Sequence, residues 1–154
     1  LHRALYQVDA GVVRGLGDQS TQERATVLAQ SLLDRIDLHV EVPALAASEL
    51  LNAPPGEGTD NIRTRCTQAR ERALARQGKP NQALQGRDID AHAGLDPAAV
   101  KFLNTAAARL GWSGRAIHRA LKVARTIADL ADAPATQVAH VAEAVQYRRA
   151  LRSA

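Results

Sequence analysis

Residues 113–130 read SGRAIHRALKVARTIADL, and this stretch decides the fold class. Its apolar side chains recur at the spacing of one broad face of an α-helix: Ile117, Leu121, Val123, Ala124, Ile127, Ala128 and Leu130. Ser113 is a typical N-cap residue at the start of this helix. A face this wide predicts a helix with neighbours on several sides, so we expect it to lie at the centre of a bundle.

The stretches on either side predict two more helices. Asp96 as an N-cap and Pro97 at the first helical position begin the earlier helix, which Gly111 ends. Pro134 breaks the central helix. The last helix begins after Thr136, which we expect to be its N-cap. Their apolar stripes are Val100, Leu103, Ala107 and Leu110 in the earlier helix, and Val138, Val141, Ala142 and Val145 in the last. With loops of about five residues or fewer, residues 96–150 predict an up-down bundle.

A further helix is predicted upstream, over DNIRTRCTQARERALARQ at 60–77. Asp60 or Asn61 can cap it, and Gly78 can end it. Its apolar stripe is narrow: Ile62, Cys66, Ala69 and Ala73. The place of Cys66 on that stripe indicates a small buried hydrophobe rather than a nucleophile.

Residues 36–42, IDLHVEV, alternate between apolar and polar side chains, as a half-buried β-strand does. The sequence holds no second run of comparable quality, and one strand alone is not a fold. This run therefore stays disordered, packs on the bundle as irregular chain, or pairs with another copy of the chain. Ordering a residue costs about 1–2 kcal/mol, so we expect residues 1–55 to be largely flexible, with residual order confined to 31–43.

The charge of the 154-residue chain, +4 overall, changes abruptly along its length. Residues 1–60 hold 4 basic and 9 acidic side chains, whereas residues 61–79 hold 6 and 1. The change follows a Pro/Gly-rich stretch, which indicates a domain boundary. We therefore expect an unassigned segment at 1–30, a remnant of another domain with a linker at 31–55, and a helical domain at 56–154.

Composition narrows the function classes. One cysteine allows no internal disulfide, which favours a reducing, cytoplasmic compartment. No apolar run reaches the ~20 residues of a membrane span, so we expect no membrane partner. The five histidines lack metal-ligand spacing, and the sequence has no Walker-type phosphate loop, H-E-x-x-H or C-x-x-C. We expect no metal site and no self-sufficient catalyst.

The basic helix at 61–79 leaves two interpretations open. Its arginines could follow the phosphates of a nucleic acid, each contact releasing counterions: Arg63, Arg70, Arg72 and Arg76. From the sequence alone, a solvated face on an alanine-rich helix is the favoured interpretation. No aromatic side chain is interleaved for base stacking.

Several separated motifs fall in a recognisable order: SLLDRIDLHVEVP (31–43), LNAPPGE (51–57), ARERALARQGKPNQAL (69–84), SGRAIHRALKVARTIADL (113–130) and TQVAHVAEAVQYRRAL (136–151). Together they resemble the magnesium-chelatase-like AAA+ ATPases, specifically the ComM/YifB branch. The resemblance covers residues 31–152 and not 1–30. It implies an all-α C-terminal lid bundle, preceded by a flexible segment with a remnant strand of the nucleotide-binding core. The Walker A and B segments, which precede this region in the family, are not in the sequence.

The resemblance also implies roles for two arginines. Arg35 matches the arginine finger, which acts in trans on the γ-phosphate held by a neighbouring subunit, with Asp34 and Asp37 holding it in pose. Arg115 matches the sensor-2 arginine, which contacts an ATP phosphate from the start of the lid helix. From the residues alone, a salt-bridged arginine at a strand edge is the preferred interpretation of Arg35. For Arg115, a solvated arginine in a first helical turn is disfavoured by a few tenths of a kcal/mol, because a basic side chain there opposes the helix dipole.

Arg119 and Arg125 follow on the same helix, and we expect them at the lid surface or a subunit interface. The family resemblance implies ATP and Mg²⁺ as cofactors of the intact parent, other copies of the parent in a ring oligomer, and action on DNA in competence or recombination. The chain alone is predicted to be inactive. Two alternatives stay open: the ATPase subunit of a magnesium chelatase, and a free-standing basic helical module that binds nucleic acid without ATP.

Overall fold

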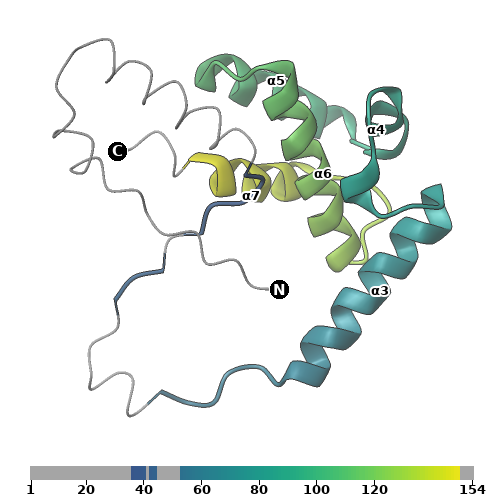
Figure 1. Ribbon diagram of the computed structural model, residues 1–154. Coiled ribbons are helices and arrows are strands. Elements are labelled where there is room, and N and C mark those ends of the chain that lie inside the picture. Colours follow the sequence, from purple (N-terminus) through teal and green to yellow (C-terminus); the bar gives the residue numbers. More distant parts are fainter. Residues whose placement is uncertain (1–35, 41, 45–52, 150–154) are drawn as a thin grey trace, which may run out of the picture. The chain divides into compact units, whose positions relative to one another are not determined.

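The computed structural model describes residues 36–40, 42–44 and 53–149. Predictions for residues 1–35, flexibility included, lie outside the described residues. The described part is helical and contains no strand, which confirms the all-α fold class (Figure 1). Its elements are α3 (Thr59–Gln77), the 3-10 turn η2 (Asn81–Ala83), α4 (Arg87–His92), α5 (Pro97–Leu110), α6 (Gly114–Leu130) and α7 (Val138–Arg149).

Capping residues mark the ends of helices α5 and α6. The Asp96 carboxylate accepts the amide hydrogen of Ala99 at 2.6 Å, and the Ser113 hydroxyl accepts that of Ala116 at 3.3 Å. These bonds satisfy amides that the first turns of α5 and α6 leave without helical partners. Gly111 ends α5 at φ 57°, in the left-handed region that glycine adopts without strain.

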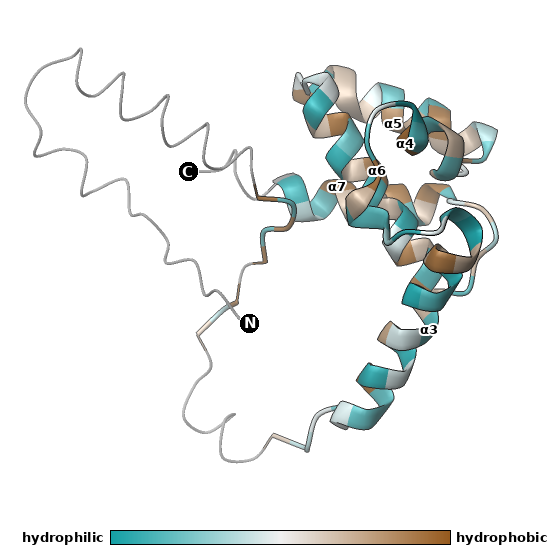
Figure 2. Cartoon of the chain, turned by 45° about the vertical axis from the view of Figure 1, so that its right-hand side comes forward, coloured by the Kyte–Doolittle hydropathy of each residue, from teal (hydrophilic) through white to brown (hydrophobic). Residues whose placement is uncertain are grey.

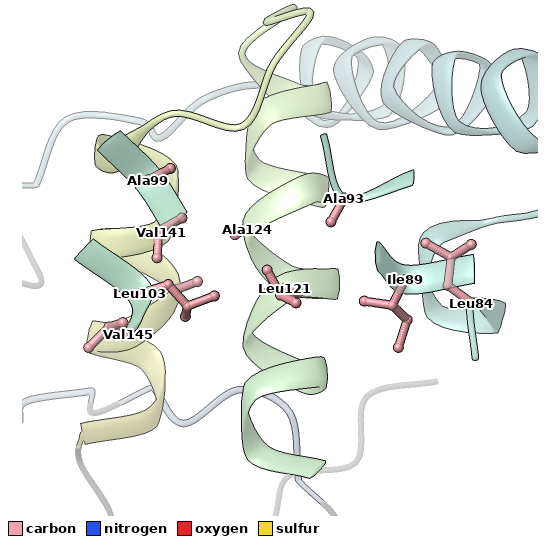
Figure 3. Close-up of a cluster of buried hydrophobic side chains, with 10 residues drawn as sticks. Leu84, Ile89, Ala93, Ala99, Leu103, Leu121, Ala124, Val141 and Val145 are labelled. Atoms are coloured by element: carbon pink, nitrogen blue, oxygen red, sulfur yellow. The ribbon is translucent and has the colours of Figure 1, made fainter. Parts of the chain in front are cut away.

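Helix α6 is central, as predicted, because it packs against α7, α3, α4 and η2. In Figure 3, Leu121 of α6 lies between side chains of α5 and α7 on one side and Leu84 and Ile89 on the other. The buried cluster consists of Leu84, Ile89, Ala93, Ala99, Leu103, Leu121, Ala124, Val141, Ala144 and Val145. Four of its ten members are alanines, whose small side chains let the helices approach closely.

Helix α3 is attached to the bundle along a narrow line. Only Ala69 and Ala73 are buried on it, and most of its surface is hydrophilic (Figure 2). The prediction that Cys66 is buried is wrong: the thiol is exposed, and the buried residues of α3 are Ala69 and Ala73. The expected side-chain cap is also absent, since Gly58 is the N-cap residue and makes no such bond.

Thr136 does not cap the last helix, contrary to the prediction. Its hydroxyl is fully buried and donates to the carbonyl oxygen of Ala93 at 2.6 Å. Its backbone N–H donates to Gly94 at 2.8 Å, and its carbonyl accepts from Asp96 at 3.1 Å. Thr136 therefore ties the loop before α7 to the loop before α5.

The predicted strand at 36–42 is not formed in the described residues, 36–40 and 42–44, which are irregular chain. The side chains expected to face a core are exposed instead, Leu38 by 49%, Val40 by 68% and Val42 by 82%. Of the three possibilities raised by the sequence, residues 37–39 follow the second, irregular chain packed on the bundle, through polar contacts described below.

Candidate functional site

Arg115 lies in the first turn of α6, two residues after the Ser113 cap. Its side chain is exposed and forms no hydrogen bond or ion pair with the described residues. No acidic side chain is present in this turn. A guanidinium next to the amides of a helix N-terminus is suited to an anionic oxygen such as a phosphate.

Arg119 lies one helical turn after Arg115 and binds the segment at 37–39. Its Nη1 lies 2.9 Å from Oδ1 of Asp37, with the two side chains 24% and 58% exposed. Close by, the N–H of His39 donates to the carbonyl oxygen of Tyr147 on α7 at 2.9 Å. Asp37 was predicted to hold Arg35, but among the described residues its partner is Arg119; Asp34 and Arg35 lie outside the described residues.

The His39 side chain is half-buried beside α7, and its Nε2 is buried with no partner among the described residues. Burial lowers the pKa of His39, and the positive charge of Arg148 lowers it further. The Arg148 guanidinium lies over the Trp112 ring, 5.8 Å from its centroid. The neutral imidazole is therefore the form that fits between the segment and the helices.

A buried ionic network joins α3 to α6 around Asp129, which is 1% exposed. Its carboxylate accepts from Arg125 Nη2 at 2.9 Å, from Arg76 Nη1 and Nη2 at 2.7 and 3.0 Å, and from Asn81 Nδ2 at 2.8 Å. Burial alone would raise the pKa of Asp129. The hydrogen bonds from Arg76 and Asn81 and the charge of Arg125 outweigh burial and hold this pKa below its usual range.

Arg125 is a buried member of this network. The sequence-based prediction that it lies at the lid surface or a subunit interface is wrong. Arg125 is 2% exposed, and burial lowers the pKa of its guanidinium. Besides Asp129, it donates to the carbonyl oxygens of Ala133 at 2.7 Å and Pro134 at 3.3 Å. These bonds fold the end of α6 into the loop that precedes α7. The signal in the sequence was an Arg and an Asp four residues apart on an otherwise apolar face.

The four arginines predicted to contact nucleic acid are placed differently from one another. Arg76 binds Asp129, and Arg72 donates to the Asp129 carbonyl at 2.8 Å and pairs with Asp132 at 2.7 Å. Arg63 pairs with the exposed Asp60 at 2.6 Å. Arg70 is exposed and has no partner in the described part of the chain. Contact with nucleic acid stays a prediction, and Arg63 and Arg70 are the more available pair.

The described ranges, 36–40, 42–44 and 53–149, contain neither a cluster of metal ligands nor a membrane-spanning helix. No three His, Cys, Asp or Glu side chains there are grouped as metal ligands. None of the helices there combines the length and apolar character needed to cross a membrane.

Residues 56–148 match the family described as "Magnesium chelatase, subunit ChlI C-terminal". The chain belongs to this family. It is 40% identical over 126 residues to competence protein ComM of Haemophilus influenzae, a match that covers 81% of this chain and 25% of that protein. It is also 39% identical over 122 residues to the YifB protein of Salmonella typhimurium, covering 79% of this chain and 24% of YifB.

A protein of Mycobacterium bovis is 35% identical over 127 residues, covering 79% of this chain and 25% of that protein. This chain is thus a ComM/YifB-like member of the magnesium-chelatase family within the AAA+ proteins. It spans about a quarter of the length of the curated relatives that it matches.

Proposed function

We propose that this ComM/YifB-like chain is the lid part of a ring-forming AAA+ ATPase and supplies two arginines to its ATP sites. Arg115 would contact a phosphate of bound ATP as sensor 2, and Arg35 would act in trans as the arginine finger. ATP and Mg²⁺ would be held by segments that precede this region in the family. The 40% identity to ComM favours this branch over a magnesium-chelatase subunit.

The observation that carries the proposal is the state of Arg115. Several arginines of the described part are engaged in ion pairs, including Arg72, Arg76, Arg119 and Arg125. Arg115 instead stands exposed at a helix start, beside amides and with no acidic side chain in its turn. That arrangement leaves its guanidinium available to an anion supplied from elsewhere.

The test is ATP hydrolysis by a chimera in which this chain replaces the matching segment of the Haemophilus influenzae relative. Arg115→Ala should lower kcat/KM for ATP about 10- to 150-fold, the equivalent of one charged hydrogen bond to the ligand. Arg109→Ala is the matched control, because Arg109 is also exposed on a helix and has no partner among the described residues. Equal activity of the two variants would contradict the role of Arg115.

We also propose that the parent acts on DNA in the cytoplasm, with α3 facing the phosphates. The excess of basic over acidic side chains at 61–79 and the exposure of Arg63 and Arg70 support this. A mobility-shift titration of this chain at two salt concentrations tests it. Arg63→Ala with Arg70→Ala should weaken binding and reduce the salt slope by about one unit per lost phosphate contact. Binding no weaker than that of the Arg109→Ala control would contradict the assignment to α3.

A further inference from the structure

The segment at 37–39 is held to the helices by polar contacts and not by its apolar residues. Asp37 is bound by Arg119, which follows it by 82 residues, and the His39 amide is bound by the Tyr147 carbonyl. Leu38, between them, is 49% exposed. Burial of apolar surface therefore does not explain why this stretch lies against α6 and α7.

The Arg119–Asp37 ion pair joins a residue near Arg115 in sequence to a residue near Arg35 in sequence. Arg119 follows Arg115 by four residues on α6, so their side chains share one face of the helix. Asp37 follows Arg35 by two residues, and chain geometry alone limits that Cα separation to about 7 Å. A shift of α6 that follows nucleotide contact at Arg115 would reach the residues after Arg35 through this pair.

We propose that Arg119 is a positioning residue: through Asp37, it fixes the segment that follows Arg35 to the helix that carries Arg115. This inference rests on the proposed function. Arg119 acts here through Asp37 rather than on ATP itself, because one of its Nη atoms already donates to the carboxylate. The His39–Tyr147 bond is the second point of attachment and keeps the segment from pivoting on the ion pair.

The first test uses this chain and measures hydrogen exchange at the His39 amide, whose protection reports attachment of the segment. Arg119→Ala should speed this exchange about two- to fivefold, as expected for loss of a partly exposed ion pair. Exchange at Leu121 and Val141 in the core should not change, which separates loss of attachment from loss of folding. Arg109→Ala is the control and should have no effect.

Reversal of the charges supplies the specific readout. Asp37→Arg alone should speed exchange at His39, and its combination with Arg119→Asp should restore protection. Arg119→Lys should retain most of it. Unchanged exchange in Arg119→Ala, or failure of the reversed pair to restore protection, would overturn the attachment.

The second test uses the chimera and separates this inference from the proposed function. Arg119→Ala should lower kcat for ATP with little change in KM, and the reversed pair should recover kcat. If Arg35→Ala and Arg115→Ala reduce hydrolysis but Arg119→Ala does not, the positioning role is wrong and the proposed function stands. If Arg35→Ala and Arg115→Ala have no effect on hydrolysis, the proposed function fails, and the attachment of residues 37–39 has no catalytic role. Hydrogen exchange at the His39 amide still confirms or refutes the attachment itself.

Discussion

Asp129→Ala removes only a small side chain but should strongly lower the free energy of unfolding of this domain. The carboxylate is 1% exposed and accepts four side-chain hydrogen bonds, three of them from arginines. Its removal leaves Arg125, itself 2% exposed, without an opposite charge. Removing one partner of a buried ion pair costs about 3–5 kcal/mol. That is a large share of the roughly 5–15 kcal/mol that stabilises a typical domain.

Urea unfolding followed by far-ultraviolet circular dichroism and by the fluorescence of Trp112, the one tryptophan, measures this cost. Asp60→Asn is the control, because Asp60 forms an ion pair with Arg63 that is exposed on both sides. It should change the free energy of unfolding by less than about 1 kcal/mol. Hydrogen exchange should show α3 loosened first, at Ala69 and Ala73, since the network is what joins α3 to α6.

The pH dependence supplies a second readout of Asp129. Its pKa is lower in the folded protein than in the unfolded chain, so the unfolded chain binds more protons in acid. This part of the stability is complete above about pH 4, near the unfolded pKa, and is lost as the pH falls through the folded pKa. Asp129→Asn should lack that part of the acid sensitivity. If Asp129→Ala cost no more than Asp60→Asn, the network would not be what holds α3 in place.

Three further predictions concern other parts of the domain. Leu121→Ala should cost about 2–5 kcal/mol in urea unfolding, because this leucine is buried at the centre of the core, and a cost below about 1 kcal/mol would contradict its placement. Gly94→Ala should cost about 1–2 kcal/mol by the same assay, because Gly94 has φ +58°, in the left-handed region where alanine is strained; a neutral effect would refute that backbone conformation. Attachment of residues 37–39 should be complete above about pH 6.5 and weaken as the pH falls below it, because the pKa of His39 is lowered by burial and by Arg148. The protection factor of the His39 amide measures this, and His39→Gln should remove the pH dependence; an unchanged dependence in that variant would assign it to another group.

Helix positions were predictable from local chemistry. The stripe of 113–130 identified α6 and its central position, and Asp96, Ser113 and Gly111 marked helix ends that the structure confirms. These signals act within one or two helical turns, so a single sequence contains them. The last helix was found from its apolar stripe, although its expected cap, Thr136, serves another loop.

Contacts between distant segments were not predictable in the same way. Arg76 and Asp129 are 53 residues apart, and nothing in the local pattern of α3 says which of its arginines meets an acid. Cys66 was wrongly predicted to be buried for the same reason. The apolar stripe of α3 does not show which of its residues α6 covers. The alternation at 36–42 shows which side chains share a face of an extended chain, but pairing as a strand requires a sheet that the described residues do not contain.

The proposed function requires this chain to supply arginines to an ATP site held by other segments. Steady-state ATP hydrolysis by the chimera carrying Arg35→Ala and Arg115→Ala together decides whether it does. The control carries Arg87→Ala and Arg109→Ala, two exposed arginines of the same chain. We expect kcat to fall at least about 10³-fold in the first protein, in line with the contribution of arginine fingers, and to stay near normal in the second. If turnover without Arg35 and Arg115 stays within a few-fold of the control, these arginines do not serve the ATP site.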